Sequence, residues 1–460
     1  MSETVKHLTK GEILNVISKP GAKVYFVGVG GVSMISLFCL SRHFGISVLG
    51  SDRKCSPLTA ALIDAGADIV IGEREAVDKD TALLVYSHAV PEGQRERRFA
   101  REREIPEVTR AEYMGAIMQC YERRIGVSGS HGKSTVTAMI SKIFSDAGLR
   151  PTTLSGASLF GSELPFSIGS LDYLIYEGCE YKDSFLSFSP TLSVFLNMEL
   201  DHTDYFPTEE ALETSFLSAM RHAEKIIVNA DDEKLLALAK RSGRQAVTFG
   251  KNKNADYRYE IFAEKSRNMQ FKVYKNGEEL GEIRLSMLGL FNVSNATAAI
   301  AAALESSIDF SSLSASLSSF SGIGRRLEKI GDYKGRALYY DYAHHPTEIS
   351  ASVSAVRDAE GDKVTVIFRP HTYSRTKGLW QDFSASLRRA DYAIILDIDA
   401  VRESEIEGVS AEALAKSFGG IYCPGTDALL EIIDKTEGAV ILMGAADVEA
   451  VKKCLTMDIA

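Results

Sequence analysis

The alternation of short apolar segments with helical patterns limits the fold of this chain more than any other sequence feature. Near the N-terminus, Val24–Val27, Val48–Leu49 and Leu83–Tyr86 are apolar runs of strand length, and segments of helical periodicity separate them. This alternation is typical of parallel strands that are joined by crossover helices. We therefore predict an α/β fold.

The same pattern returns in the middle of the chain. The apolar run Ile125–Val127 is followed by a glycine-rich loop and by a predicted helix at Ser134–Ala147. Further strands are predicted at Tyr173–Tyr176, Leu192–Asn197 and Lys225–Asn229. The pair Asn276-Gly277 between two alternating runs predicts a β-hairpin, and the alanine-rich segment Ala296–Ala303 indicates a closely packed helix.

A third block of alternating segments opens near Gly322. Its predicted strands are Ala337–Tyr340, Lys363–Phe368, Tyr392–Leu396 and Ala439–Met443. A chain of 460 residues has room for several domains of roughly 100–200 residues each. We predict a Rossmann-like domain at residues 1–116, a central domain with a P-loop ATPase-type sheet at 117–322, and a second Rossmann-like domain at 323–460.

The composition is that of a soluble globular protein. A net charge of -10 argues against a general nucleic-acid or membrane-surface binder. The segment MSETVKHLTKGEIL lacks the apolar core of a signal peptide, and no run approaches the roughly 18 apolar residues that cross a bilayer. The six cysteines form no CxxC pair, so we expect mostly buried thiols and neither a disulfide frame nor a zinc site. These features predict a cytoplasmic protein.

A glycine-rich turn, FVGVGGVSM, follows the first predicted strand and opens a helix. Gly28, Gly30 and Gly31 let the backbone approach a diphosphate, and the helix N-terminus offers free N–H groups. Asp52 ends the next predicted strand and could accept hydrogen bonds from a ribose. The Gly-x-Gly-Gly spacing disfavours a dinucleotide. Another nucleotide diphosphate is the favoured ligand, and a tight turn without a ligand is the alternative.

The segment Val127–Thr135, VSGSHGKST, has the end of a phosphate-loop pattern but valine in place of its first glycine. Lys133 can neutralise phosphate charge, and the Ser134 hydroxyl can bind Mg²⁺. The position of the segment between an apolar strand and a helix argues against a chance Gly-Lys-Ser.

Polar clusters follow the next two predicted strands. Their members are Glu177, Glu180 and Asp183 after the first strand, and Asn197, Asp201, His202 and Asp204 after the second. Because ligands bind at the carboxyl ends of strands in open α/β sheets, these groups are candidate metal ligands beside the loop. For either cluster taken alone, a solvated loop is the alternative.

Six segments occur in the order that is found in the Mur ligases. They are GSHGKST, NMELDHTDY, GLFNVSNATAAIAAA, GIGRRLE, YDYAHHPTE and FRPHTYSRT, and FVGVGGVSM precedes them. The chain resembles this family over nearly its whole length. The resemblance implies a UDP-sugar domain, a central ATPase domain and a C-terminal domain that binds an amino acid. It also implies that ATP phosphorylates a carboxylate of the UDP-sugar and that an amine then attacks the acyl phosphate.

The resemblance also assigns residues. Catalytic roles fall on Lys133, Glu180, His202 and Arg326, and Mg²⁺ would be held by Ser134, Glu180 and His202. The ATP site would comprise Gly129, Ser130, His131, Gly132, Lys133, Ser134, Thr135, Asn292, Asn295, Arg326, Asp341 and His345. The UDP-sugar would be bound by Gly28, Gly30, Gly31, Val32, Ser33, Ser51 and Asp52. The amino acid would be bound by Tyr342, His344, His371 and Arg375.

Within the last group, Arg375 suits an α-carboxylate because a guanidinium binds carboxylates in a forked pair. For His371 a structural role is the alternative.

Three positions depart from the family pattern: Cys179 replaces an acid, Phe291 a common histidine and Thr372 a frequent arginine. These departures bear on amino-acid specificity more than on the chemistry. Between His202 and Lys225 there is no lysine, so we predict no carbamylated lysine.

Within the family, AHHPTE and PHTYSRT favour the branch that adds L-alanine to UDP-N-acetylmuramate in peptidoglycan synthesis. A recycling ligase that adds a whole peptide to the same sugar nucleotide is the closest alternative, since EYKDSF resembles its sequence. A non-catalytic nucleotide-binding regulator is disfavoured because Lys133, Glu180 and His202 are all present. We expect ATP and Mg²⁺ as cofactors, small-molecule substrates, no nucleic-acid or membrane partner, and a monomer or homodimer.

Overall fold

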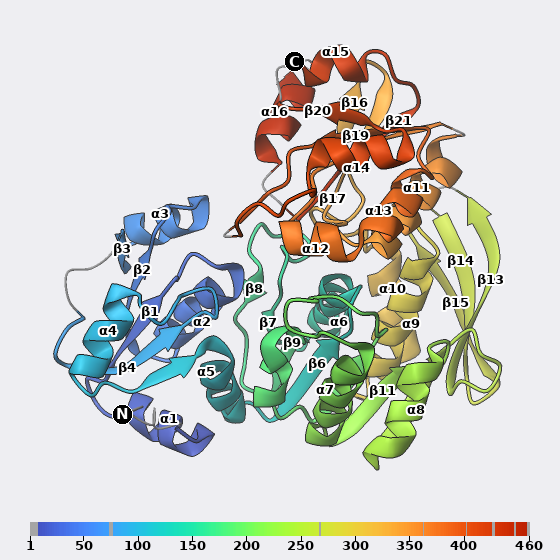
Figure 1. Cartoon of the computed structure of the whole chain (residues 1–460). Helices are drawn as coiled ribbons and strands as arrows, with labels where there is room; N and C mark the ends of the chain where they lie inside the picture. Colours follow the sequence, from blue (N-terminus) through green and yellow to red (C-terminus); the bar gives the residue numbers. More distant parts are fainter. Residues whose placement is uncertain are drawn as a thin grey trace.

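The computed structural model describes residues 8–72, 77–265, 268–361, 363–401, 403–425, 428–445 and 448–457. Within them the chain forms three sheets, each from a continuous stretch of sequence (Figure 1). The α/β class and the three-domain architecture are therefore confirmed. The boundaries after residues 116 and 322 stay predictions, and the outermost residues 1–7 and 458–460 lie outside the described part.

The first sheet is parallel throughout and has the order β3-β2-β1-β4-β5. Its strands are β1 (Lys23–Val27), β2 (Ser47–Asp52), β3 (Asp68–Ile71), β4 (Thr81–Tyr86) and β5 (Glu107–Thr109). Its helices are α1 (Lys10–Ile17), α2 (Val32–His43), α3 (Pro57–Asp64), α4 (Arg95–Glu102) and α5 (Arg110–Ile117). Because β2 and β4 lie on opposite sides of β1, the loops after β1 and β4 separate and leave a crevice, as in Rossmann-like sheets.

The central sheet has the order β15-β14-β13-β12-β11-β10-β6-β9-β7-β8. Its strands are β6 (Arg123–Ser128), β7 (Thr152–Leu154), β8 (Phe166–Ser167), β9 (Tyr173–Gly178), β10 (Leu192–Phe195), β11 (Lys225–Asn229), β12 (Gln245–Gly250), β13 (Tyr257–Lys265), β14 (Asn268–Lys275) and β15 (Glu278–Leu285). Its helices are α6 (Lys133–Asp146), α7 (Glu209–His222), α8 (Glu233–Ser242), α9 (Phe291–Leu304) and α10 (Phe310–Ser318), with 3₁₀ turns η1 (Met118–Cys120) and η2 (Tyr181–Ser187).

The predicted hairpin at Asn276-Gly277 is confirmed. Asn276 has φ 51° and Gly277 has φ 87°, as a two-residue hairpin turn with two left-handed residues requires. Strands β14 and β15 form the hairpin, and β13 adds a further antiparallel strand that the sequence patterns did not indicate.

The third sheet has the order β16-β17-β21-β18-β19-β20, with only β16 antiparallel to its neighbour. Its strands are β16 (Glu328–Tyr333), β17 (Arg336–Asp341), β18 (Val364–Phe368), β19 (Tyr392–Leu396), β20 (Ile421–Cys423) and β21 (Ala439–Met443). Its helices are α11 (Pro346–Glu360), α12 (Tyr373–Gly378), α13 (Trp380–Leu387), α14 (Ala411–Phe418), α15 (Leu429–Ile433) and α16 (Glu449–Met457). The direct connection from β17 to α11 carries several predicted site residues.

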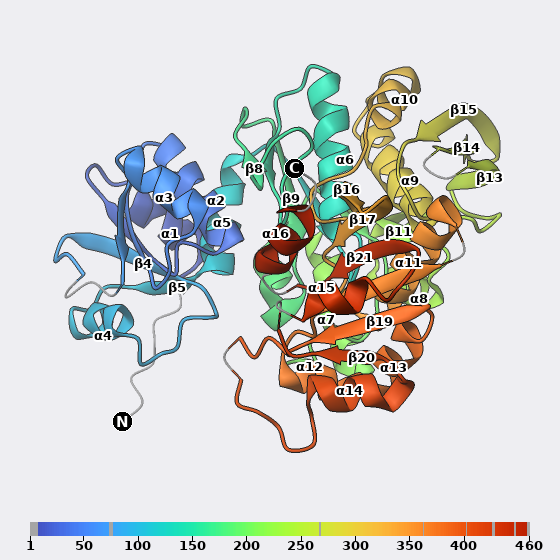
Figure 2. The ribbon, with the colours of Figure 1, turned by 90° about the horizontal axis from the view of Figure 1, so that it is seen from above.

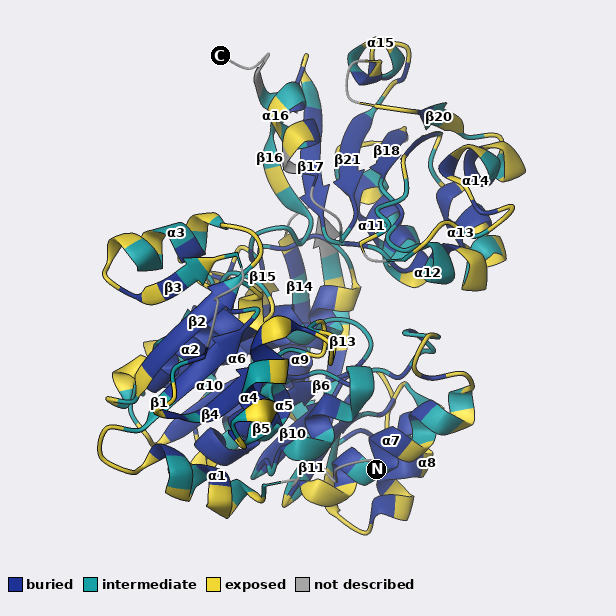
Figure 3. Cartoon of the chain, turned by 60° about the vertical axis from the view of Figure 1, so that its left-hand side comes forward, coloured by how far each residue is buried: buried dark blue, intermediate teal, exposed yellow. Residues whose placement is uncertain are grey.

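The first and central domains share one apolar core. Side chains of α5 and β1 belong to the same buried cluster as Phe185, Phe188 and Phe216 of the central domain. The third sheet has separate cores on its two faces. Figure 2 shows the first domain beside the central sheet, on the side away from β13–β15, and Figure 3 shows buried strands with exposed outer helix faces. The N-terminal domain is therefore held against the central domain by the packing of apolar side chains.

The cysteine prediction is wrong in one respect. All six cysteines are free thiols, but only Cys423 is buried. Cys55 and Cys120 are exposed because the first follows the carboxyl end of β2 in a loop and the second lies on η1 at the surface. Cys39, Cys179 and Cys454 are half-buried.

Replacement of Gly115 by alanine should loosen the packing of α5 on η2. A Cβ at Gly115 would clash with the carbonyl oxygen of Ser187, and overpacking of this kind costs about 1–3 kcal/mol. Gly11→Ala in α1 is the matched control, because nothing lies within 4 Å of its Cβ and alanine favours helix. Calorimetry should record a lower melting temperature for Gly115→Ala alone. Equal melting temperatures of the two variants would contradict the tight contact.

Candidate active site

The loop VSGSHGKST connects β6 to α6, and its shape requires its glycines. Gly129 has φ 145° and Gly132 has φ 85°, values that other residues rarely adopt. A Cβ on Gly132 would also come within 2.7 Å of Asn295 Oδ1. Within the described residues no side chain caps the N-terminus of α6, so its first N–H groups are available to an anion.

Lys133 is held by groups of the protein itself. Its Nζ donates hydrogen bonds to both carboxylate oxygens of Glu180, at 3.2 and 3.1 Å, and to the carbonyl oxygens of Gly129 and Ser130. Burial alone would lower the pKa of Lys133, but the charge of Glu180, its hydrogen bonds and the other nearby acidic groups together outweigh burial and raise the pKa above its ordinary value. Lys133 therefore carries the positive charge that phosphate binding needs.

A cavity of about 460 Å³ opens beside Lys133 and is lined by all three domains. Its walls include Val32 and Leu58 of the first domain, Lys133, Ser134, Glu180 and His202 of the second, and Arg326, Tyr342 and His344 of the third. The structure thus brings together all four predicted catalytic residues and all three predicted metal ligands. We call this space the reaction cavity.

Ser134, Glu180 and His202 line the same cavity and offer donor atoms of the kinds that bind a divalent cation. Ser134 and Glu180 are buried, and His202 Nε2 lies 3.9 Å from Glu180 Oε1. Burial lowers the pKa of His202 despite the neighbouring carboxylates, so its imidazole is neutral, as a metal ligand must be. A hydroxyl and a carboxylate are oxygen donors of the kind that Mg²⁺ prefers.

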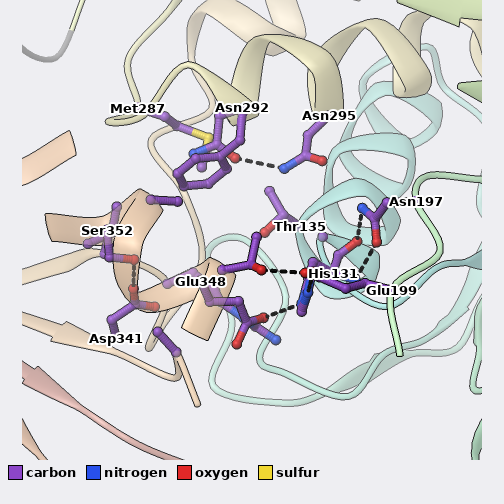
Figure 4. A pocket seen from close by; sticks show the side chains of 17 residues that line it. His131, Thr135, Asn197, Glu199, Met287, Asn292, Asn295, Asp341, Glu348 and Ser352 are labelled. Carbon is purple, nitrogen blue, oxygen red and sulfur yellow. Dashed lines mark hydrogen bonds and ion pairs between the residues drawn. The ribbon is translucent and has the colours of Figure 1, made fainter. Parts of the chain in front are cut away.

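A second cavity, of about 250 Å³, lies between the central and C-terminal domains (Figure 4). The predicted ATP residues that line it are His131, Gly132, Thr135, Asn292, Asn295, Arg326 and Asp341. His345 lies beside them, with its ring centroid 4.9 Å from that of His131. Ser130, Lys133 and Ser134 face the reaction cavity instead, and Gly129 packs against Asn197 and Leu196. The phosphate loop thus separates the two cavities.

Two glutamates that sequence reasoning missed connect the domains at this point. His131 bonds through Nε2 to Glu199 Oε2 at 2.8 Å, and through Nδ1 to Glu348 Oε1 at 3.0 Å. Glu199 follows β10, whereas Glu348 lies in the first turn of α11. Both lie inside segments that carried the family resemblance, NMELDHTDY and YDYAHHPTE, so the signal was present although no role followed from it.

The charges of this cluster depend on one another. Burial alone would lower the pKa of His131, but Glu348 and Glu199 raise it to about 9. Burial would raise the pKa of Glu348, but the charges of His131, His344 and Arg326 and the hydrogen bond with His131 together outweigh burial and hold that pKa well below its ordinary value. His131 is therefore a cation that joins a carboxylate of the central domain to one of the C-terminal domain.

The residues predicted for the amino acid divide into two sets. Tyr342 and His344 line the reaction cavity, and burial lowers the pKa of His344 to about 4. Arg375 reaches the central domain, where its guanidinium pairs with both oxygens of Asp201 at 2.8 and 3.1 Å. His371 pairs with Asp399 in a β-bridge, and its buried Nδ1 has no hydrogen-bond partner within the described residues. The structure does not bring His371 to the cavity.

The residues predicted for the UDP-sugar surround the turn after β1. The N–H groups of Gly28 and Val29 donate to the carbonyl oxygen of Ser51 at 2.8 and 3.1 Å, and the Gly30 N–H donates to Asp52 Oδ2 at 2.8 Å. The Asp52 carboxylate therefore closes the turn itself. The remaining members, Gly31, Val32 and Ser33, form the N-cap and first turn of α2, and Val32 reaches the reaction cavity.

No helix within the described residues is long and apolar enough to cross a membrane.

Comparison with known proteins gives consistent matches along the chain. Three family models match successive parts: "Mur ligase family, catalytic domain" at residues 23–122, "Mur ligase middle domain" at 127–303 and "Mur ligase, glutamate ligase domain" at 325–451. A UDP-N-acetylmuramate–L-alanine ligase of Clostridium novyi is 37% identical over 94% of this chain and 97% of its own. The enzyme of that name from Aquifex aeolicus is 36% identical over 93% and 95%.

Two solved structures share the fold. The UDP-N-acetylmuramate-alanine ligase MurC from Thermotoga maritima superimposes with a TM-score of 0.80 at 24% identity, covering 95% of this chain and 99% of that one. A murein peptide ligase from Psychrobacter arcticus gives 0.72 at 23% identity, covering 95% and 98%.

A half-buried lysine at a phosphate loop, facing a cavity to which three domains contribute, places this molecule among the multidomain ATP-dependent ligases. The matched family models reach from residue 23 to residue 451 and include the segments that form both cavities. The chain belongs to the Mur ligase family.

The charge of His131 can be measured directly. Its pKa of about 9 lies above the ordinary value of 6.5, so its bridge between the domains is complete below about pH 6.5 and is lost as the pH rises through about 9. A histidine Cε1–H NMR titration, assigned with His131→Gln, should record this late transition. Glu348→Gln should move it to lower pH. Titration of His131 near its ordinary value would contradict the charged bridge.

Proposed function

We propose that this protein joins L-alanine to UDP-N-acetylmuramate and converts ATP to ADP and phosphate, a step of peptidoglycan synthesis. The observation that carries the proposal is the reaction cavity of about 460 Å³, where three domains meet beside Lys133. Relatives named UDP-N-acetylmuramate–L-alanine ligase, at 35–38% identity, support the choice of substrates. The murein peptide ligase, which is similar in fold, marks the alternative in which a peptide replaces alanine.

The chemistry activates a carboxylate, which is a poor acyl donor. A carboxylate oxygen of the muramate attacks the γ-phosphorus of ATP, and ADP leaves. The amine nitrogen of alanine then attacks the acyl carbon and loses a proton, and the C–O bond to phosphate breaks. Lys133 neutralises charge on the transferred phosphoryl group. Arg326 lines both cavities, and we assign it a second positive charge for the same group.

We also propose how the ligands divide between the sites. The cavity of about 250 Å³ takes the adenosine of ATP. Phe291, which is 41% exposed, offers an aromatic face there, Asn292 and Asn295 offer amides, and Asp341 faces the ribose. The turn at Gly28–Ser33 takes the UDP portion. Bound Mg²⁺ would supply charge neutralisation between phosphate and carboxylate, and Ser134, Glu180 and His202 would hold it.

The remaining expectations are proposals of the same kind. We place the domain boundaries after residues 116 and 322, where the first and second sheets have ended and before the next sheets begin. We propose that the enzyme works in the cytoplasm, as a monomer or homodimer and without nucleic-acid or membrane partners.

The function is tested by phosphate release. Purified protein with ATP, Mg²⁺ and UDP-N-acetylmuramate should release phosphate when L-alanine is added, and less with glycine, serine or a peptide that begins with L-alanine. Lys133→Ala is the control, since it should abolish release and still bind the UDP-sugar in the first domain. Faster release with the peptide would favour the recycling ligase. No release with any of the four would contradict the ligase function.

Asp201 should compete with alanine for Arg375. Its carboxylate already pairs with the guanidinium that we assign to the α-carboxylate of alanine. The side chains of Asp201 and Arg375 are only 9% and 11% exposed, so alanine must exchange one buried ion pair for another. Asp201→Asn should lower KM for alanine by about tenfold, a change of about 1.4 kcal/mol, and change KM for ATP less. Asp204→Asn in the same loop is the control, since Asp204 bonds to Tyr181. An unchanged or higher KM for alanine would contradict this role.

A further inference from the structure

His131, Glu199 and His345 bring three metal-ligating atoms together outside the predicted Mg²⁺ site. His131 Nε2 lies 2.8 Å from Glu199 Oε2, and His345 Nδ1 lies 3.7 Å from the same oxygen. All three atoms lie within 4.8 Å of one another. The three residues come from the phosphate loop, the segment after β10 and the N-cap of α11. Figure 4 shows His131, Glu199 and Glu348 pointing toward one another at the domain interface.

Further hydrogen bonds hold these side chains in place. Glu348 bonds to the second ring nitrogen of His131 at 3.0 Å, which is the carboxylate–histidine arrangement that orients imidazole ligands in metal sites. Glu348 is itself fixed by the backbone N–H groups of His344 and His345 at 3.0 and 3.3 Å. The other oxygen of Glu199 accepts the Thr347 hydroxyl at 2.5 Å. These contacts preorganise the three donor atoms.

Two imidazoles and one carboxylate are the donor set of a three-ligand zinc site with an open position. Imidazole suits Zn²⁺, Co²⁺ or Ni²⁺, whereas Mg²⁺ prefers oxygen. The Thr347 N–H that reaches His345 Nδ1 does so at a long 3.4 Å, so little is lost when a metal takes that nitrogen. We propose that His131, Glu199 and His345 bind one first-row transition-metal dication, such as Zn²⁺, which links the central domain to the C-terminal domain.

The ion would replace the proton that His131 and Glu199 share, and that proton passes to solvent. His131 and Glu199 also line the cavity of about 250 Å³. A metal there would fix the C-terminal domain against the phosphate loop, beside the cavity that we assign to the adenosine of ATP. We therefore expect Zn²⁺ bound at this site to compete with ATP.

The metal is tested with Co²⁺ as an optical probe. Full-length protein freed of metal and nucleotide should bind one equivalent of Co²⁺ with the intense visible bands of a low-coordinate site, and Zn²⁺ should displace it. His345→Gln and Glu199→Gln should abolish the bands. Glu348→Gln, which leaves the three donors intact, should weaken binding by about 10–100-fold.

Matched variants separate this site from others on the chain. His202→Gln, and Cys55→Ser combined with Cys120→Ser, should leave the bands unchanged. Loss of the bands in His202→Gln, their survival in His345→Gln, a sulfur-to-cobalt charge-transfer band or weak octahedral absorption would each overturn the proposal. The readout does not depend on catalysis, so a failure here is distinguishable from a failure of the ligase assay.

Discussion

The parallel pairing of β6 with β9 on one side and β10 on the other is the constraint on which both cavities depend. Ser128, at the end of β6, lies opposite Gly178 of β9 and Phe195 of β10. The three loops that follow therefore leave the sheet at the same level. They carry Lys133, Glu180 and His202, which are separated by tens of residues in sequence yet line one cavity. Loss of this register would separate the phosphate loop from Glu180 and His202.

The charged side chains of the site pair with one another. Lys133 binds Glu180, Arg375 binds Asp201, and His131 binds both Glu199 and Glu348. A buried charge without a partner costs several kcal/mol, so a site built for anions and cations must satisfy its groups internally when those ligands are absent. Two of these pairs cross from the central to the C-terminal domain. A ligand that replaces one member of such an ion pair therefore also changes the contact between the two domains.

The three departures from the family pattern have different surroundings. Cys179 lines the reaction cavity, and burial raises the pKa of its thiol, so it adds no negative charge beside Glu180. Phe291 lines the cavity of about 250 Å³ at the start of α9 and offers an apolar face there. Thr372 caps α12 by accepting the N–H of Arg375. The threonine thus positions the backbone of the arginine but supplies no second positive charge.

The sequence by itself determined the class of fold, the strand–loop–helix units and most of the candidate site, because periodicity and glycine positions act locally along the chain. The hairpin at Asn276-Gly277 and the phosphate loop are examples. Tertiary structure alone decided the partners of each charge. Glu348 pairs with His131 although 217 positions separate them in sequence, and Asp201 pairs with Arg375 at a separation of 174 positions. Local sequence patterns do not encode pairings between residues so far apart in the chain. Likewise, His371 belongs to the segment FRPHTYSRT and is close to Arg375 in sequence. It nevertheless forms a β-bridge with Asp399, because side-chain direction follows from the packing of the whole sheet.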